Sequence, residues 1–209
     1  MLPEDVPSPI DYRVMSEARK WEATAMEKRP CRTQIFERFA SEIAASRVPI
    51  RRVLELGSGP GFLACQVLRA ISDISYVALD FSPAMHQLAK QRLGLLASTV
   101  EFVERTFKDG GWSRDLGAFD CVLTNQAVHE LRHKRHAVGL HSEVRRVLAA
   151  GGSYLVCDHF AGEGGMNHEQ LYMSVEEQQS ALRKAGFTDV ELLLLKGGLV
   201  LHRATARCP

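Results

Sequence analysis

The sequence predicts an α/β fold with a doubly wound, mostly parallel seven-stranded sheet and helices on both faces. Short apolar runs alternate with segments of helical spacing between residues 53 and 187, which is typical of consecutive strand–helix–strand units. The first of these runs leads directly into a turn with three glycines. Two further apolar runs flank a Gly–Gly pair near the C-terminal end, and this predicts a hairpin that closes the sheet with an antiparallel strand.

The first 46 residues are expected to form an arm and two helices packed on the core, with residues 47–209 as the main domain. Residues 1–11 are rich in proline, which favours an irregular surface segment. Residues 13–28 and 31–46 contain no proline or glycine, and their composition and apolar spacing favour two helices.

Two large amphipathic rings, Tyr12 and Trp21, belong to this N-terminal region. One interpretation is that the helix around Trp21 packs on the edge of the domain. The other is that it covers a ligand site as a lid, with both rings in the substrate pocket. The sequence leaves both interpretations open.

The main domain can be divided into elements in order. Strands are expected at residues 53–56, 74–80, 99–103, 119–124, 153–158, 190–195 and 199–203, with helices at 62–71, from 83, from 140 and from 175 to 186. Ser82 followed by Pro83 is typical of a helix N-terminus. Ser174 and Glu177 have the spacing of a capping box. The Gly151–Gly152 pair is expected to end the helix that precedes it.

Composition and charge restrict the class of protein. The 209 residues are 45% hydrophobic and 24% charged, as in ordinary globular domains, and the net charge of +1 gives no overall attraction to nucleic acid. The five cysteines, at positions 31, 65, 121, 157 and 208, are odd in number and form no Cys-x-x-Cys pair, which favours a reducing compartment. We find neither a secretory signal pattern nor an apolar run of membrane-spanning length, so we expect a cytoplasmic protein without a membrane partner.

The glycine turn is the first candidate binding site. Gly57, Gly59 and Gly61 alternate, and glycine permits positive φ and close approach of a ligand to the backbone. Asp80 ends the second expected strand, nineteen residues after Gly61. In a doubly wound sheet this carboxylate lies beside the glycine turn, where it can accept hydrogen bonds from ribose hydroxyls. An aspartate that merely forms a turn is the alternative.

The turn does not match the usual nucleotide fingerprints, because Phe62 stands where a dinucleotide site has its third glycine and no phosphate-loop lysine follows. Residues 55–61, 80–85 and 119–125, together with 144–156 and 182–187, instead resemble the successive motifs of class I S-adenosylmethionine-dependent methyltransferases. The resemblance extends from about Arg51 to the C-terminal end. It implies a Rossmann-like fold, S-adenosylmethionine as cofactor and S-adenosylhomocysteine as product.

The resemblance also implies roles for individual residues. The methionine part of the cofactor would be surrounded by Gly57, Ser58, Gly59 and Gly61, with Glu55 near its ammonium and Asn125 near the sulfonium. Asp80 would bind the ribose. The adenine would be bordered by Phe81, Thr106 and Phe107. Thr106 stands where the family commonly has aspartate. Because a hydroxyl binds the adenine amino group less strongly than a carboxylate does, we expect modest cofactor affinity.

Methyl transfer needs in-line positioning of the acceptor, and a general base only when the acceptor arrives protonated. His129 follows the fourth expected strand and His159 follows the fifth, so both are expected at the sheet edge that holds the methyl group. Either histidine is a candidate base or merely lines the pocket. Gln126 and His129 are expected in the substrate pocket with Tyr12 and Trp21.

Residues 129–133 also spell His-Glu-x-x-His, which in a helix binds zinc. No third ligand follows at a recognised spacing, and the segment is expected in a loop, so zinc hydrolysis is a secondary alternative and no metal ligand is assigned. A cofactor-binding subunit without turnover is another alternative.

The one basic cluster, residues 132–136 with Arg145 and Arg146, is explained by a solvated surface. The chain also lacks the Asn/Asp-Pro-Pro-Tyr/Phe motif typical of enzymes that methylate base amino groups. We therefore expect a small-molecule substrate rather than nucleic acid, with RNA- or protein-directed methylation as the alternative. The methyl acceptor and the oligomeric state are left open.

Overall fold

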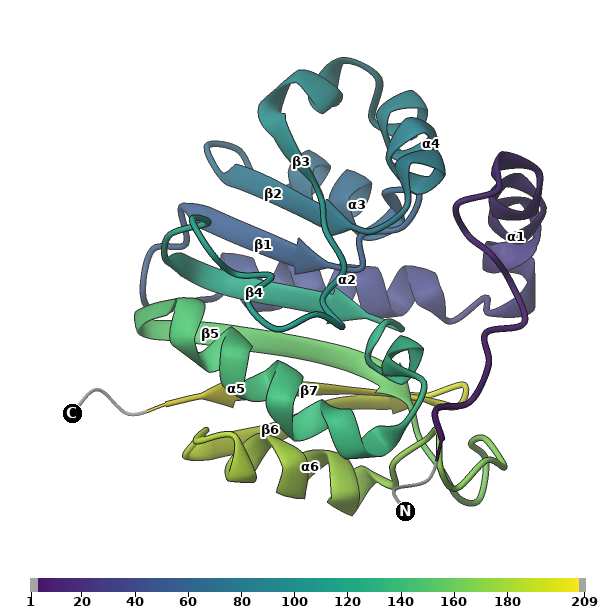
Figure 1. Cartoon of the computed structure of the whole chain (residues 1–209). Helices are drawn as coiled ribbons and strands as arrows, with labels where there is room; N and C mark the ends of the chain where they lie inside the picture. The colour runs from purple at the N-terminus through teal and green to yellow at the C-terminus, as the bar shows by residue number, and fades with distance from the viewer. Residues whose placement is uncertain (1–3, 207–209) are drawn as a thin grey trace.

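A computed structural model describes residues 4–206, which form one seven-stranded sheet with the strand order β3-β2-β1-β4-β5-β7-β6 (Figure 1). The strands are β1 Arg52–Leu56, β2 Ser75–Asp80, β3 Val100–Glu104, β4 Phe119–Asn125, β5 Leu148–His159, β6 Asp189–Lys196 and β7 Leu199–Thr205. Strands β1 to β5 are parallel, whereas β7 is antiparallel to both β5 and β6. The predicted doubly wound sheet with a C-terminal antiparallel strand is therefore confirmed.

Helices cover both faces of this sheet. They are α1 Met15–Lys28, α2 Arg32–Ala44, α3 Phe62–Ala70, α4 Pro83–Leu93, α5 Ala137–Val147 and α6 Val175–Lys184, with short 3-10 helices η1 Gly94–Thr99, η2 Val128–Leu131 and η3 Lys134–His136. Figure 1 shows α5 and α6 in front of the sheet and α2 and α3 behind it. Within residues 4–206, no helix combines the length and the apolar character needed to cross a bilayer.

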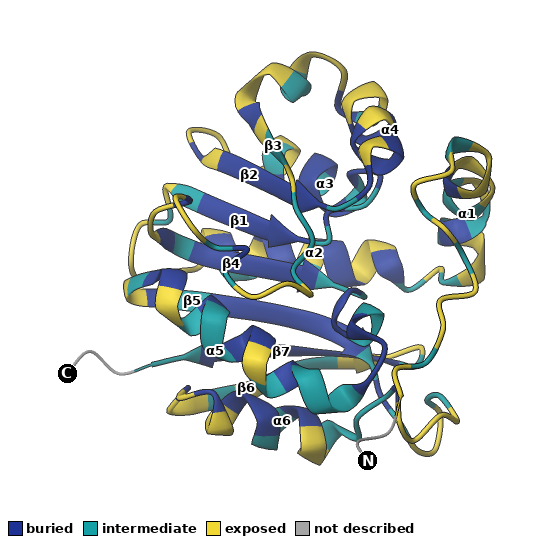
Figure 2. Cartoon of the chain, viewed as in Figure 1, coloured by how far each residue is buried: buried dark blue, intermediate teal, exposed yellow. Residues whose placement is uncertain are grey.

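Most of the core lies in two apolar clusters, one on each face of the sheet, and a small third cluster lies between α1 and α4. Figure 2 shows the buried residues along the strands and the inner sides of the helices. In β1, Leu54 and Leu56 pack with α5 and α6, while Val53 packs with α2 and α3. Successive side chains of a strand point to opposite faces. An unbroken apolar strand therefore supplies both clusters, which is why the central strands show continuous apolar runs in the sequence.

Several local signals in the sequence act as expected. The Ser82 hydroxyl accepts a hydrogen bond of 3.0 Å from a backbone N–H of the first turn of α4. Ser174 and Glu177 form a complete capping box at α6. The Gly197–Gly198 pair joins β6 to β7 with φ of 58° and 76°, the positive values that a two-residue hairpin turn requires.

The Gly151–Gly152 prediction was wrong. Helix α5 ends at Val147, and β5 begins at Leu148, so the glycine pair lies inside the strand. The pairing of β4 with β5 shifts register here, and a Cβ on Gly152 would meet two backbone carbonyl oxygens at 3.0 Å. This glycine therefore serves a bulge with close backbone approach, which a helix-ending glycine resembles in sequence.

The N-terminal arm passes the carboxyl ends of the parallel strands before α1 begins (Figure 1). The backbone N–H of Val6 donates to the carbonyl oxygen of Arg132 at 2.8 Å, and the Arg132 Nε donates back to the carbonyl of Val6 at 2.9 Å. Farther along, the Ser82 hydroxyl donates to the carbonyl oxygen of Tyr12 at 2.5 Å. The arm is thus attached to the loops after β2 and β4. Residues 1–3 of the predicted arm, and Cys208, lie outside the described residues.

Candidate active site

The glycine turn connects β1 to α3 at the carboxyl edge of the sheet. Backbone N–H groups of Gly57 and Ser58 donate to the carbonyl oxygen of Leu79 in β2, at 2.8 and 3.1 Å. Gly57 has φ of 65°, and a Cβ there would lie 2.5 Å from the Cβ of Ala127. Gly59 has φ of 53°, but a Cβ there would meet no heavy atom within 4 Å. The turn is therefore packed at Gly57 and open to the cleft at Gly59.

Two residues predicted to bind the cofactor do not line this cleft. Gly61 is the N-cap residue before α3, with φ of 76°, and a Cβ there would lie 3.0 Å from the Cβ and 3.1 Å from the Cα of Ala89 in α4. It therefore allows α3 and α4 to pack closely. Thr106 lines an adjoining cavity together with Phe81 and Phe107, which border both cavities.

Asp80 is the last residue of β2, and its carboxylate braces the glycine turn. Oδ2 accepts a hydrogen bond from the backbone N–H of Gly59 at 2.8 Å, and Oδ1 accepts one from Ser82 at 2.9 Å. Burial raises the pKa of Asp80 to about 6, although these N–H groups favour the ionised form. A carboxylate offers about four lone-pair sites, so Asp80 retains acceptor capacity for a ligand.

Glu55 in β1 is a second buried carboxyl group in the cleft. The Tyr76 hydroxyl donates a hydrogen bond of 2.7 Å to its Oε2. Burial raises the pKa of Glu55 to about 8, and the charge of Asp80 acts in the same direction. Glu55 is therefore mostly neutral at pH 7, unless a cation lies against it.

Two buried oxygen atoms in the cleft have no hydrogen-bond partner among the described residues. They are the Oγ of Ser58, in the glycine turn, and the Oδ1 of Asn125, at the end of β4. A buried acceptor without a partner costs about 1–3 kcal/mol. Both atoms therefore suit a polar ligand that donates hydrogen bonds in the cleft.

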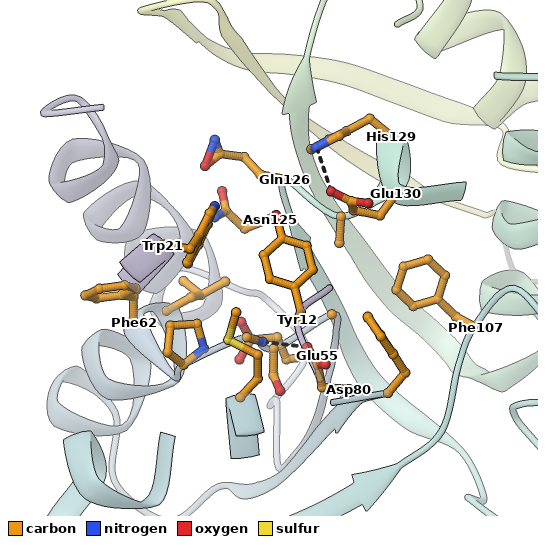
Figure 3. Close-up of a pocket in the computed structure, with 18 of the residues that line it drawn as sticks. Tyr12, Trp21, Glu55, Phe62, Asp80, Phe107, Asn125, Gln126, His129 and Glu130 are labelled. Carbon is orange, nitrogen blue, oxygen red and sulfur yellow. Dashed lines mark hydrogen bonds and ion pairs between the residues drawn. The ribbon is translucent and has the colours of Figure 1, made fainter. Parts of the chain in front are cut away.

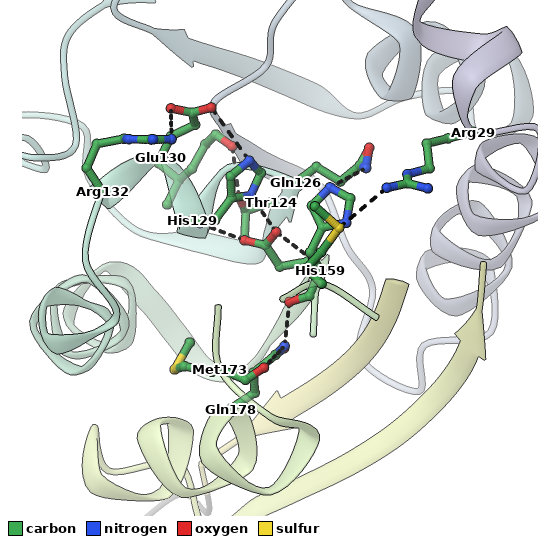
Figure 4. Close-up of polar contacts among 12 residues, drawn as sticks. Arg29, Thr124, Gln126, His129, Glu130, Arg132, His159, Met173 and Gln178 are labelled. Carbon is green, nitrogen blue, oxygen red and sulfur yellow. Dashed lines mark hydrogen bonds and ion pairs between the residues drawn. The ribbon is translucent and has the colours of Figure 1, made fainter. Parts of the chain in front are cut away.

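Gln126 follows Asn125 in a left-handed backbone conformation, with φ of 55°. Its backbone N–H donates to the carbonyl of Cys157 in β5 at 2.7 Å, which helps to hold this conformation. The side-chain Oε1 accepts from the Nε of Arg32 at 2.6 Å, and Nε2 lies 3.5 Å from the Nε2 of His159. The amide of Gln126 therefore links Arg32 in α2 to His159 at the end of β5, and Figure 4 shows the contact with His159.

His129 lies in η2 and forms a close pair with Asp158, near the end of β5. The two atoms His129 Nδ1 and Asp158 Oδ1 are 2.6 Å apart. Burial opposes a positive charge on His129, but the attraction and hydrogen bond of Asp158, with the charge of Glu130, raise its pKa above 6.5. The pKa of Asp158 is lowered, because His129 outweighs the effect of burial. Nε2 of His129 points toward the cleft and lies 3.5 Å from Glu130 Oε1 (Figure 3).

His159, the other candidate base, is in a different state. Burial lowers its pKa to about 4, so its ring is neutral at pH 7. The rings of His129 and His159 lie 5.2 Å apart between centroids, and both line the cleft. The structure therefore brings both candidate histidines together, but only His129 has a ring nitrogen, Nδ1, in contact with a carboxylate.

The cleft encloses about 890 Å³ of space, part of which is open to solvent. Tyr12 and Trp21 close one side with their rings edge to face, 5.9 Å apart. The sequence analysis missed several lining residues: Arg32, Phe36, Phe62, Met85, Ala127 and Glu130. Phe62 follows the glycine turn, and Met85 lies in the first turn of the helix after Asp80, so the motifs could have predicted that both line the cleft. Nothing in the sequence marks Arg32.

The His-Glu-x-x-His segment does not form one helix. Helix η2 ends at Leu131, and Arg132 follows with φ of 66°. His133 then points its Nδ1 to the backbone N–H of Arg135 at 3.1 Å. Across residues 4–206, no group of three or more His, Cys, Asp or Glu side chains is arranged to hold a metal ion. The two histidines are therefore not one helical turn apart on a common face, as a zinc helix needs.

Comparison with known proteins finds a matching domain model and several similar proteins. Residues 53–152 match the model of a methyltransferase domain. The chain is 25% identical over 180 residues to malonyl-[acyl-carrier protein] O-methyltransferase of Geobacter sulfurreducens, covering 76% of this chain and 64% of that one. It is 34% identical over 128 residues to "Probable phthiotriol/phenolphthiotriol dimycocerosates methyltransferase 2" of Mycobacterium ulcerans, covering 61% and 46%. The chain thus spans less than two thirds of the length of these relatives.

Solved structures share the fold. Human N-acetylserotonin methyltransferase, in complex with S-adenosylmethionine, superposes with a TM-score of 0.70 at 17% identity, over 94% of this chain and 58% of that one. Such identity establishes the fold alone. The glycine turn, Asp80 and Asn125 lie at the sheet edge that the motifs predicted. With the domain match and these relatives, they support a class I S-adenosylmethionine-dependent methyltransferase.

Proposed function

We propose that this protein transfers the methyl group of S-adenosylmethionine to a hydroxyl oxygen of a small molecule by in-line displacement. One observation carries the proposal: the His129–Asp158 pair opens onto the same cleft as the glycine turn and Asp80. A base is needed where the acceptor arrives protonated, as a hydroxyl does. Several relatives are named as O-methyltransferases of a malonyl group on acyl carrier protein, which also supports an oxygen acceptor.

The cleft fits the cofactor. Asp80 would accept bonds from the ribose hydroxyls, and Glu55 would face the ammonium of the methionine part, whose charge would lower the raised pKa of that carboxyl. The unpartnered Ser58 Oγ and Asn125 Oδ1 would accept bonds from the same part. Phe81 and Phe107 would flank the adenine, and Thr106 would lie at the outer edge of the adenine. Gly57, Gly59 and Gly61 would give the turn its shape. The bound cofactor supplies an activated methyl group on a sulfonium, which is a good leaving group.

His129 would act as the general base. Asp158 accepts the Nδ1–H of the neutral ring, so the lone pair of Nε2 faces the cleft. The proton of the acceptor hydroxyl passes to Nε2 as the new oxygen–carbon bond forms, and Asp158 stabilises the resulting imidazolium. Positioned bases of this kind contribute about 10²- to 10⁴-fold to the rate. His159, neutral and bonded to Gln126, would orient the acceptor rather than take its proton.

The N-terminal segment supports a small acceptor. Tyr12 and Trp21 lie over the cleft, and the arm is bonded to the loops after β2 and β4. We propose that arm and α1 form a lid that excludes water and encloses a small molecule. This arrangement favours a metabolite over RNA or a folded protein. The described cysteines are all free thiols, and with the cysteine pattern of the sequence this supports a cytoplasmic location.

Two measurements test the proposal. Titration calorimetry should show binding of S-adenosylhomocysteine and no comparable binding of NAD. The protein is then incubated with a metabolite extract of its source cells and S-adenosylmethionine labelled in the methyl group. Transfer of label to a small molecule by the parent, with loss in His129→Gln at unchanged S-adenosylhomocysteine affinity, is the expected result. Binding of S-adenosylhomocysteine without transfer of label to any component of the extract would instead favour a cofactor-binding subunit.

A further inference from the structure

Arg32 places a buried positive charge in the wall of the cleft. It is the first residue of α2, and only 7% of its surface is exposed. Nε donates to the Oε1 of Gln126 at 2.6 Å, and Nη1 donates to the carbonyl oxygen of Ala25 in α1. Its second terminal nitrogen, Nη2, has no acceptor among the described residues. The acceptors that it does have are neutral, so they do not balance its charge.

No carboxylate compensates this charge. In the described part of the chain, neither Arg32 nor its neighbour Arg29 has an acidic oxygen within 4.0 Å. Nη2 of Arg29 lies 3.6 Å from the sulfur of Met166. Burial lowers the pKa of Arg32 to about 10, and the positive charge of Arg29 adds to that effect. Two guanidinium groups thus repel each other at the end of the cleft where the substrate would lie.

A buried charge without a partner is costly, and proteins normally pair it or place it where a ligand pairs it. Acidic groups that line the cleft are engaged elsewhere. Glu130 lies 3.4 Å from the Nη1 of Arg132 and 3.5 Å from the Nε2 of His129. Glu55 bonds to Tyr76, on the glycine-turn side. Arg32 is therefore the cationic group of the cleft that lacks an anion.

The hydrogen bonds of Arg32 also fix its neighbours. An Nε–H can donate only to the oxygen of the Gln126 amide, so the amide nitrogen must face His159. A neutral His159 then accepts with Nε2. Arg32, Gln126 and His159 thus form one oriented polar wall of the cleft that His129 also lines. Its donors, the remaining N–H groups of Arg32, match an oxyanion, which guanidinium binds with two parallel bonds.

We propose that the methyl acceptor is an organic acid, whose carboxylate or other oxyanion binds Arg32 while its hydroxyl group meets His129. The proposal rests on the methyl transfer proposed above and adds the chemical class of the substrate. Arg32 is a specificity-determining residue, because it binds a part of the acceptor that does not react. A charge-assisted pair of this kind changes affinity by about 10- to 100-fold.

Fractionation of the metabolite extract by charge tests this directly. Anion exchange at pH 8 separates retained, anionic metabolites from those that pass through, and each fraction is assayed with the parent protein and labelled S-adenosylmethionine. We expect the methyl acceptor in the retained fraction. An acceptor found only in the flow-through would overturn the anion proposal and leave methyl transfer intact. Label in neither fraction would overturn both, so the two failures are distinguishable.

Chemical masking identifies the source of the oxyanion. One portion of the retained fraction is coupled to methylamine with a carbodiimide, which converts carboxylates to amides, and another is treated with alkaline phosphatase. Loss of acceptor activity after coupling assigns a carboxylate, and loss after phosphatase assigns a phosphate ester. Activity that survives both assigns a phosphonate or sulfonate, which Arg32 would bind equally well. All three results support an anionic acceptor.

Variants connect the preference to Arg32. In Arg32→Gln we expect the KM for the retained fraction to rise about 10- to 100-fold, with Arg32→Lys in between because it keeps the charge without the planar fork. Arg47→Gln, which removes an exposed arginine between α2 and β1, is the matched control. Affinity for S-adenosylhomocysteine and the thermal midpoint show whether each variant is folded. An unchanged KM in a folded Arg32→Gln protein would overturn the assignment; if that variant does not fold, the fractionation of the parent decides.

Discussion

Asp158 holds His129 through both of its carboxylate oxygens. Oδ1 lies 2.6 Å from the ring Nδ1, and Oδ2 accepts the backbone N–H of the same residue at 2.8 Å. The first contact selects the tautomer and the second sets the position of the main chain. The carboxylate is itself almost fully buried at the end of β5, so the sheet determines where the imidazole stands.

Asp158→Asn is expected to lower the plateau rate of methyl transfer and to move the inflection of its pH profile to lower pH. The base form of His129 is needed, so the rate of the parent should rise with pH through a pKa above 6.5. Without the negative charge that pKa falls, and the inflection moves to lower pH. The plateau of kcat should drop by about 100-fold, since a neutral amide stabilises imidazolium poorly.

The matched control is Asp73→Asn, at an exposed turn residue with φ of 61°, a conformation that asparagine tolerates. It should leave kcat and the profile unchanged. A profile of Asp158→Asn identical to that of the parent would mean that His129 is not the base.

The parent protein is expected to lose stability toward unfolding as pH rises to about 8, and Glu55→Gln is expected to abolish that loss. The folded-state pKa of Glu55 is about 8 and its ordinary value is 4.5, so the folded protein holds a proton that the unfolded chain releases. Stability from this group is complete below pH 4.5 and is lost as pH rises to about 8, by about 1.4 kcal/mol per pH unit.

Denaturant unfolding at pH 6.5 and 8 checks this prediction. Over that interval the parent should lose more stability than Glu55→Gln, while Glu101→Gln, at an exposed position of β3, should follow the parent. Equal slopes for parent and Glu55→Gln would contradict the raised pKa. Calorimetry in buffers of different ionisation enthalpy should also show proton release when S-adenosylmethionine binds at pH 7, because its ammonium lowers that pKa.

Alanine substitutions in the glycine turn should separate stability from binding. Gly57→Ala and Gly61→Ala place a Cβ within 2.5 and 3.0 Å of another side chain and should destabilise the fold by about 1–3 kcal/mol. Gly59→Ala meets no protein atom within 4 Å, so only its positive φ costs stability, about 1 kcal/mol. Its Cβ would instead occupy ligand space. Unfolding and S-adenosylhomocysteine titration should therefore rank the three variants differently, and full binding by Gly59→Ala would contradict the site.

Asp80→Ala should weaken the binding of S-adenosylhomocysteine by about 10- to 100-fold, or ~1.5–3 kcal/mol. It removes the acceptor of the Gly59 and Ser82 backbone N–H groups as well as the proposed ribose contact. Asp80→Asn keeps one acceptor oxygen and should lose less. Calorimetry measures both, with the unfolding midpoint as the test of folding. Parent-like affinity in Asp80→Ala would show that the carboxylate only supports the turn.

The parts of the fold that depend on local chemistry were predictable. Ser82 with Pro83 and Ser174 with Glu177 begin helices because their bonds lie within one turn. The Gly151–Gly152 prediction failed because a bulge and a helix end both need glycine, and the sequence does not say which carbonyl groups come close. The His-Glu-x-x-His segment was expected in a loop, and the left-handed Arg132 interrupts the single helix that the zinc alternative would need.

The site divides in the same way. Gly57, Asp80 and Asn125 stand at the ends of strands, and parallel strands bring those ends to one edge, so their convergence followed from the motifs. Arg32 reaches the cleft only through the packing of α2 beside Gln126, at a sequence separation of 94 residues. Asp158 was visible only as the residue before His159, because its partner His129 is 29 residues away. Contacts between such distant segments are set by tertiary packing.

At position 126, a substitution that stabilises the fold would also remove a side chain of the substrate pocket. Its left-handed backbone is strained for a residue with a side chain, so Gln126→Gly would relieve about 1 kcal/mol. The same substitution would delete the amide that joins Arg32 to His159. Directed evolution for heat tolerance alone would therefore tend to select this change and broaden the range of accepted molecules. Libraries intended to keep selectivity should hold position 126 constant.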